Sequence, residues 1–134
     1  MNVVGLFREL DCEMSPALDS IHDLLGKLSV DKVAMVVAYL RGGTPVFDVM
    51  GVSTDPLDRR FVFSGGPSLL SDGQWVWRAD AYYFVEKYRI RLPNDFVEHV
   101  VAAGGVPADM SDEIVRIGED VVASYESATK LGNP

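Results

Sequence analysis

The chain has 134 residues, of which 48% are hydrophobic and 24% are charged. This length and composition are typical of one globular domain with a buried core, and they exclude a disordered chain. The net charge of −8 argues against general nucleic-acid binding, and no apolar run approaches the ~18 residues of a membrane-spanning helix.

Charge is concentrated at the two ends of the sequence. Residues 1–31 and residues 107–134 each contain six acidic and two basic residues, so each end has a net charge of −4, whereas residues 32–106 contain eight of each sign. Such acidic ends would attract a basic partner. They are equally typical of the surface of an acidic soluble protein, and this simpler interpretation stays open.

The N-terminal segment and the single cysteine favour a reducing, cytoplasmic location. Arg8 and Glu9 interrupt MNVVGLFREL, which is therefore not typical of a secretory leader. Cys12 has no second cysteine with which to form a disulfide, and its neighbours Asp11 and Glu13 should disfavour its thiolate.

Two helices are predicted in the first third of the chain. In SPALDSIHDLLGKL (15–28), Ser15 is a suitable N-cap, Pro16 is a favoured first helical residue, and apolar residues recur at helical spacing. A second helix is predicted over 31–41, where Gly42 provides a natural stop. The valine content of this second segment is equally compatible with a strand.

The next segment has the composition of β-structure. TPVFDVMGV (44–52) and RFVFSGG (60–66) predict two strands, with STDPLDRR as the turn between them. LLSDGQWVWR (69–78) predicts a hairpin closed by Asp72 and Gly73. Its second arm would place the two tryptophans on one face, and Gln74, Val76 and Arg78 on the other.

Three more helices are predicted after the strands. ADAYYFVEKYRI (79–90) is followed by a helix that opens at Pro93 and by a last helix with Ser111 as its N-cap. The buried stripes predicted for them are Ala81, Phe84, Val85 and Tyr88; then Phe96, Val97, Val100 and Val101; then Ile114, Ile117, Val121, Val122 and Tyr125.

Segregated helices and strands indicate an α+β fold rather than a doubly wound nucleotide fold. We expect a small antiparallel sheet of three to four strands covered by about five helices. The whole chain, 1–134, should form a single compact domain, with flexible ends over 1–14 and 129–134.

No residue pattern marks a catalytic or metal site. His22 and His99 are the only histidines, and both fall on outward faces of predicted helices, where His99 should pair with Asp95 one turn earlier. Neither histidine has a second ligand at zinc-binding spacing, so no metal or cofactor is expected. The Gly-Gly pairs fit no phosphate-binding loop.

A small enzyme that uses loop aspartates is one alternative. Asp48, Asp55, Asp58 and Asp72 lie in predicted loops and at strand ends, where functional sites are common. Turn formation before a proline and before a glycine already accounts for Asp55 and Asp72. Asp48 and Asp58 are therefore the stronger candidates for this alternative.

The segment SDGQWVWRADAYYFVEKYRIRLP (71–93) combines aromatic and basic residues. Such a combination can stack bases and hold phosphates, so a second alternative is a module that binds a ligand or single-stranded nucleic acid. Its binding residues would be Arg78, Lys87, Arg89 and Arg91. We expect instead that Trp75 and Trp77 are core residues covered by Phe84 and Tyr88, with Tyr82, Tyr83 and the basic residues as a rim.

The same segment carries a resemblance to a known class of proteins. In LLSDGQWVWRADAYYFVEKYRIRLPNDFVEH (69–99), the residues of the pattern are Asp72, Gly73, Trp75, Trp77, Tyr82, Tyr83, Tyr88, Leu92, Pro93 and Phe96. The pattern resembles that of small, single-domain immunity proteins of bacterial toxin systems. YLRGGTPVFDVMG (39–51) extends it more weakly, so the resemblance covers about half of the chain.

The resemblance implies a cytoplasmic inhibitor whose acidic surface caps a toxin domain, and it implies no catalytic or binding residue. With the charge pattern, it leads to the prediction of a non-catalytic protein-binding domain that neutralises a toxin, plausibly a basic one such as a nuclease. No nucleic acid, membrane or cofactor is expected as a partner. The residues predicted to contact the toxin are Asp19, Asp23, Asp112, Glu113, Asp120, Tyr82 and Tyr83.

Overall fold

Four short strands form the central sheet of the structure, a computed structural model that describes residues 1–10 and 14–130. Their order is β1-β6-β5-β2, with β1 parallel to β6 and the other neighbours antiparallel. The bounds are Asn2–Val3 for β1, Thr44–Phe47 for β2, Leu69–Ser71 for β5 and Trp75–Arg78 for β6. The sheet is therefore mixed, not antiparallel as predicted. The sequence does not reveal the parallel strand β1, because two residues are too few to give an alternating pattern.

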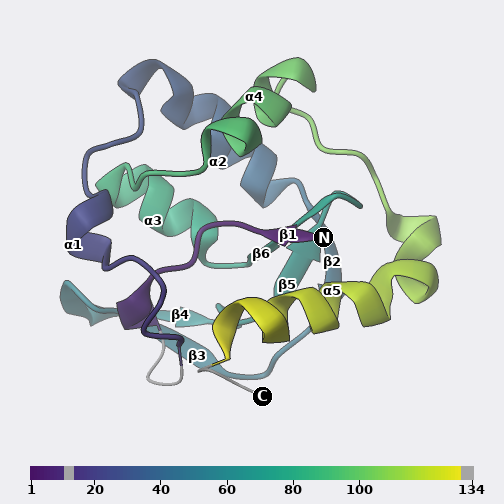
Figure 1. Cartoon of the computed structure of the whole chain (residues 1–134), viewed down its shortest axis with the longest axis horizontal. Coiled ribbons are helices and arrows are strands. Elements are labelled where there is room, and N and C mark those ends of the chain that lie inside the picture. Colours follow the sequence, from purple (N-terminus) through teal and green to yellow (C-terminus); the bar gives the residue numbers. More distant parts are fainter. Residues whose placement is uncertain (11–13, 131–134) are drawn as a thin grey trace.

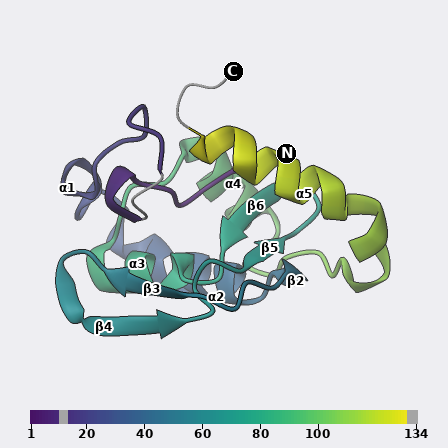
Figure 2. The same ribbon diagram turned by 90° about the horizontal axis from the view of Figure 1, so that it is seen from below.

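A separate two-stranded sheet consists of β3 (Val52–Asp55) and β4 (Asp58–Ser64). The sequence predicts one strand over 44–52 and a long turn after it, whereas β2 ends at Phe47 and the turn is reduced to the two residues 56–57. Figure 2 shows this β3–β4 hairpin projecting at one side of the molecule, with β4 outermost.

Five α-helices and three short 3₁₀ turns complete the described part of the chain. The helices are α1 (Ile21–Leu24), α2 (Val33–Arg41), α3 (Ala81–Tyr88), α4 (Asn94–Ala102) and α5 (Ile114–Thr129), and the turns are η1 (Arg8–Leu10), η2 (Val30–Lys32) and η3 (Ser111–Glu113). Helices α2, α3 and α4 pack on one face of the central sheet and α5 packs on the other (Figures 1 and 2). The predicted α+β class is confirmed, and segment 33–41 is a helix.

The two tryptophans of β6 lie in the main core, as predicted. Trp77 is fully buried, and its Nε1 donates a hydrogen bond of 2.8 Å to the Leu40 carbonyl. Its ring centroid lies 5.8 Å from that of Tyr39 and 6.0 Å from that of Phe96. The aromatic rings that cover Trp77 thus come from α2 and α4. The predicted cover, Phe84 of α3, packs instead against Phe7, with ring centroids 5.0 Å apart.

The opposite face of β6 is also buried. Val76 is inaccessible to solvent and packs with Ile117 and Val121 of α5 in a second, smaller cluster. The predicted alternation of β6 is therefore confirmed, but Arg78 on the same face is also buried, with 2% of its surface exposed.

The first helix is much shorter than the sequence predicts. Ser15 closes a turn by accepting the Ala17 N–H, whereas Ser20 is the N-cap of α1. Glu9 determines this start, because its carboxylate accepts the Ser20 hydroxyl at 2.5 Å and the Ile21 N–H at 2.8 Å. A contact between segments eleven residues apart therefore overrides the local helical pattern.

Two details of the later helices also differ from the prediction. Val101 is 44% exposed rather than buried, because α4 turns this position away from the core. Ser111 does not cap α5, since it lies in η3 and bonds to Asp109.

Cys12 and the tail residues 131–134 lie outside the described residues. Within the described ranges, no helix is long and apolar enough to span a membrane.

Candidate functional site

Exposed apolar side chains gather on and beside the β3–β4 hairpin. Among residues 1–10 and 14–130, eleven large hydrophobic residues are exposed, and six of them lie between residues 47 and 62. Within the hairpin, Val52 is 63% exposed, Val62 56% and Phe61 39%. Just before the hairpin, Met50 is fully exposed. Isolated exposed hydrophobic residues are common in proteins, but a gathering of this kind on one projecting element is a candidate contact surface.

Strand pairing determines which side chains of the hairpin face outward. Thr54 is paired with Val62, and Val52 is paired with Ser64, so these side chains lie on one face. We call Val52, Thr54 and Val62 the hairpin face. The opposite face holds the buried Ser53, and it lies against the body of the molecule.

Aromatic rings of α3 hold the inner face of the hairpin. Phe61 stacks on Tyr83 with ring centroids 4.2 Å apart, and Phe63 meets Tyr82 edge-on at 5.7 Å. Arg41 of α2 lies over the Tyr82 ring, 4.8 Å from its centroid. Tyr82 and Tyr83 are predicted as rim residues that contact a partner, and the structure places both, half-buried, beneath the hairpin.

Asp55 joins the hairpin to α3 by hydrogen bonds. Its Oδ2 accepts the hydroxyls of Tyr83 and Tyr88, each at 2.6 Å, and its Oδ1 accepts the N–H groups of Leu57 and Asp58 in the turn. Burial would raise the pKa of this carboxyl, but the bonds from the tyrosines and the turn outweigh it and hold the pKa below its usual value. Both carboxylate oxygens of Asp55 are therefore engaged in hydrogen bonds that hold the hairpin on α3.

The remaining loop aspartates do not converge on one site. Asp58 accepts from Arg60 at 3.0 Å and from Lys87 at 3.2 Å, and these hydrogen bonds lower its pKa to about 2. Asp48 is exposed. Asp72 lies at the end of β5, on a different sheet from Asp55 and Asp58. Of the four loop aspartates, Asp55 and Asp58 therefore meet at Lys87, whereas Asp72 lies apart from them.

His99 binds Asp72, and not Asp95 as the sequence predicts. His99 Nε2 lies 2.8 Å from Asp72 Oδ2, and the Tyr39 hydroxyl donates to the same oxygen at 2.5 Å. The Trp75 N–H donates to the other carboxylate oxygen at 2.8 Å. Burial opposes the charge of Asp72, yet these bonds keep its pKa below the usual value. The turn residues enclosed between Asp72 and Trp75 are Gly73 and Gln74, one position later than predicted.

The basic residues of the aromatic segment do not form a continuous groove. Arg78 is buried in an ion pair with Asp80, while Lys87 binds the aspartates of the hairpin. Arg89 donates to the Leu28 carbonyl at 2.8 Å, and Arg91 is exposed in the loop before α4. Because their partners belong to different parts of the fold, the nucleic-acid alternative has no assembled surface.

The acidic residues predicted to contact a toxin fall into two groups. Asp19 and Asp23 lie at α1, whereas Asp112, Glu113 and Asp120 belong to η3 and α5. Figures 1 and 2 show α1 and the start of α5 at opposite sides of the molecule. Glu113 is paired with Arg116, and Asp120 lies 3.8 Å from the N-terminal amine. They therefore flank the molecule rather than form one surface.

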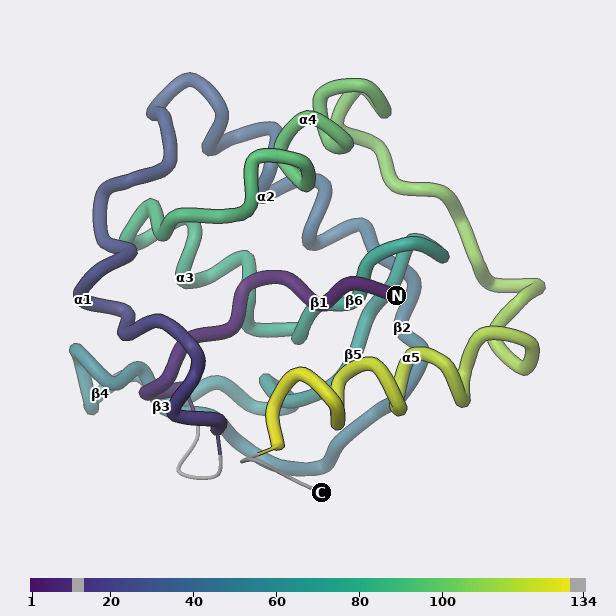
Figure 3. The backbone as a smooth tube through the Cα atoms, viewed as in Figure 1, coloured from purple at the N-terminus to yellow at the C-terminus, as the bar shows by residue number. Residues whose placement is uncertain are grey.

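A cavity of about 690 Å³ lies beside the hairpin, between β3 and the N-terminal segment. Figure 3 shows this segment running from β1 to the vicinity of β3. Arg8, Arg59 and Arg78 line the cavity together with one acid, Glu9, and the exposed His22. We call this cavity the arginine pocket. Of its arginines, only Arg78 is among the residues that the sequence predicts to bind a ligand, because the proximity of η1 to β3 has no local sequence signal.

Within residues 1–10 and 14–130, no three His, Cys, Asp or Glu side chains gather in a way that could hold a metal ion. Comparisons with protein-family models, with curated proteins and with solved structures gave no match. A function for this chain must therefore be inferred from its geometry and from its resemblance to immunity proteins.

Proposed function

We propose that this chain is a protein-binding domain that neutralises a bacterial toxin domain, and that the hairpin face is its main contact surface. The observation that carries this proposal is the gathering of exposed apolar side chains on the β3–β4 hairpin. Val52 and Val62 are more than half exposed on one face of the hairpin.

The hairpin also has the rigidity that a binding surface needs. Its inner face is fixed by the Phe61–Tyr83 stack and by the hydrogen bonds of Asp55. Association therefore costs little conformational entropy, because the surface is ordered before the partner arrives. Phe61 lies on the inner face but keeps 39% of its surface exposed, and a partly exposed aromatic ring is a favourable anchor for a partner.

The acidic residues have a supporting role in this proposal. Exposed charges at α1 and along α5 give the molecule its negative field without lying on the hairpin face. Such charges increase the association rate of a basic partner more than they increase affinity. The toxin-neutralising part of the proposal is supported by the resemblance to immunity proteins.

Site-specific photo-crosslinking tests the proposal in the native host. A photo-crosslinking amino acid at position 62 reports on the hairpin face, and the same amino acid at position 115 is the matched control. Val62 and Val115 are both exposed valines, 56% and 97%, but Val115 lies on α5. We expect position 62 to capture one protein that position 115 does not.

The captured protein must then behave as a toxin. Its expression alone should arrest growth, and coexpression of this chain should restore growth. A captured protein that is harmless, or one that position 115 captures equally well, would contradict the proposal.

A further inference from the structure

The arginine pocket has a lining that is unusual for this acidic chain. Among the described residues, its charged side chains are three arginines and Glu9, although the whole protein has a net charge of −8. The rest of the lining is mainly apolar, with Leu10, Met14, Pro16, Val52, Pro56 and Leu57 among its residues. A concave site of several hundred Å³ with apolar walls and a few convergent polar groups is typical of ligand binding.

Arg78 is held rigidly at one wall of the pocket. Its Nε and Nη2 donate to the two oxygens of Asp80 at 3.2 and 2.8 Å, and Nη1 donates to the Tyr125 hydroxyl at 3.3 Å. Burial opposes its charge, but the Asp80 carboxylate outweighs this effect and raises the pKa of Arg78. A guanidinium has five N–H donors, so this arginine has donors left for a ligand.

Asp80 is held in turn from the hairpin. The Ser53 hydroxyl donates to its Oδ2 at 2.7 Å, and both side chains are buried. The buried ion pair with Asp80 fixes the direction of the Arg78 guanidinium, but the pair as a whole gives the pocket no net charge. The unneutralised positive charge of the pocket must therefore come from other residues.

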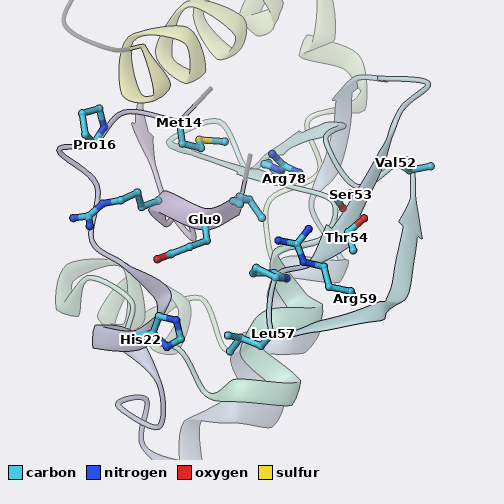
Figure 4. A pocket seen from close by; sticks show the side chains of 13 residues that line it. Glu9, Met14, Pro16, His22, Val52, Ser53, Thr54, Leu57, Arg59 and Arg78 are labelled. Atoms are coloured by element: carbon cyan, nitrogen blue, oxygen red, sulfur yellow. The ribbon is translucent and has the colours of Figure 1, made fainter. Parts of the chain in front are cut away.

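Arg59 supplies this charge. It is exposed at the start of β4, and no described residue provides it with an ion-pair or hydrogen-bond partner. Figure 4 shows the Arg59 guanidinium reaching into the pocket, turned toward Arg78. Glu9 does not neutralise it, because its two oxygens accept the Ser20 hydroxyl and the Ile21 N–H. Arg59 and Arg78 thus both line the pocket, and no carboxylate among the described residues pairs with Arg59.

We propose that the arginine pocket binds a carboxylate or phosphate carried on an apolar group, with Arg59 and Arg78 holding the anion. Guanidinium groups bind both anions in a bidentate manner, and the apolar walls accept the attached group. This inference does not depend on the proposed toxin partner. The anion belongs either to a small molecule or to an acidic side chain of a protein, and both sources offer the same chemistry.

Titration of the purified chain with small probes tests this inference. The anionic probes are octanoate and phenyl phosphate, and octanamide is the uncharged control. We expect saturable binding of the anionic probes by NMR, with the largest shifts at residues of the pocket. The matched variants are Arg59→Gln and Arg60→Gln, because Arg60 is adjacent in sequence, lies outside the pocket lining and has a 91% exposed side chain.

The R59Q variant should weaken anion binding by about tenfold or more, while R60Q should change it less than about twofold. A blocked acidic tripeptide distinguishes the two sources: tighter binding of the peptide indicates a protein side chain, and tighter binding of the small probes indicates a free anion. Equal binding of octanamide, equal losses in R59Q and R60Q, or no binding of any anionic probe would overturn the inference.

These outcomes are independent of those for the proposed function. Photo-crosslinking at position 62 probes the part of the hairpin face that lies outside the pocket lining, whereas R59Q probes the pocket, although Val52 and Thr54 belong to both surfaces. Failure of one measurement therefore leaves the other unaffected.

Discussion

The ring of Phe61 stacks on the ring of Tyr83, with centroids 4.2 Å apart and planes inclined by 15°. The hydroxyl of the same tyrosine donates to Asp55, at the turn end of β3. One residue of α3 therefore holds both strands of the hairpin, by its ring on β4 and by its hydroxyl on β3. This arrangement fixes the inner side of the hairpin and leaves the hairpin face to solvent.

Replacement of Asp55 should release the hairpin from α3. In D55A, the hydroxyls of Tyr83 and Tyr88 and two N–H groups of the turn lose their acceptor, so the free energy of unfolding should fall by about 2–3 kcal/mol. D48A is the control, since Asp48 is exposed and should change stability by less than about 0.5 kcal/mol. Urea denaturation measures both. Equal stability of D55A and the wild type would show that this carboxylate does not anchor the hairpin.

Stability should decrease in acid because of two buried carboxylates. The pKa values of Asp55 and Asp72 are lowered in the folded state, whereas in the unfolded state they have ordinary values of about 4. Below about pH 4 the unfolded chain binds protons that the folded chain does not, so the free energy of unfolding falls as pH falls. Above this range the contribution is fully present.

Urea denaturation between pH 2.5 and 6 measures this effect. D72N should show a flatter acid slope than the wild type, because the amide does not titrate. The same slope in both proteins would mean that Asp72 has an ordinary pKa in the folded state.

The sequence predicts the elements with regular apolar patterns far better than it predicts the site. Helices α2 to α5 have apolar residues at helical spacing; α2, α3 and α4 form within their predicted segments, and α5 extends one residue into the predicted tail. The helix expected over 15–28 fails, because Glu9 binds Ser20 and starts α1 there. That contact depends on the path of the N-terminal segment, which no local pattern encodes.

The sequence does not predict the candidate site either, because its residues are brought together by tertiary contacts. Alternation shows that Val52 and Val62 occupy strands, but it does not show that their face lacks a covering element. Arg59 becomes a pocket residue only because η1 lies beside β3. Likewise, His99 is close to Asp95 in sequence, but it meets Asp72 across the core instead. Each of these relationships is made by tertiary packing.

Two glycines should respond to alanine in opposite directions. A Cβ at Gly66 would lie 2.0 Å from Ser53 Oγ and 2.9 Å from Asp80 Oδ2, so G66A should lower the free energy of unfolding by about 1–3 kcal/mol. A Cβ at Gly118 would meet no atom within 4 Å, and this residue lies inside α5. G118A should therefore stabilise the protein by about 0.5–1 kcal/mol.

Thermal or urea denaturation of the two variants measures these effects. Stabilisation by G66A would mean that Ser53 and Asp80 are not held together as described. Destabilisation by G118A would mean that α5 has a close neighbour at this position.

The affinity of two charge-introducing variants for the captured partner tests the central claim most directly. In V62R the arginine would lie in the middle of the hairpin face, where burial of a charge against a partner is unfavourable. In V115R the same change lies on α5, on a valine that is even more exposed than Val62. Isothermal titration calorimetry should show affinity reduced by about tenfold or more for V62R and by less than about twofold for V115R. Loss of affinity in V115R with unchanged affinity in V62R would contradict the assignment of the hairpin face as the contact surface.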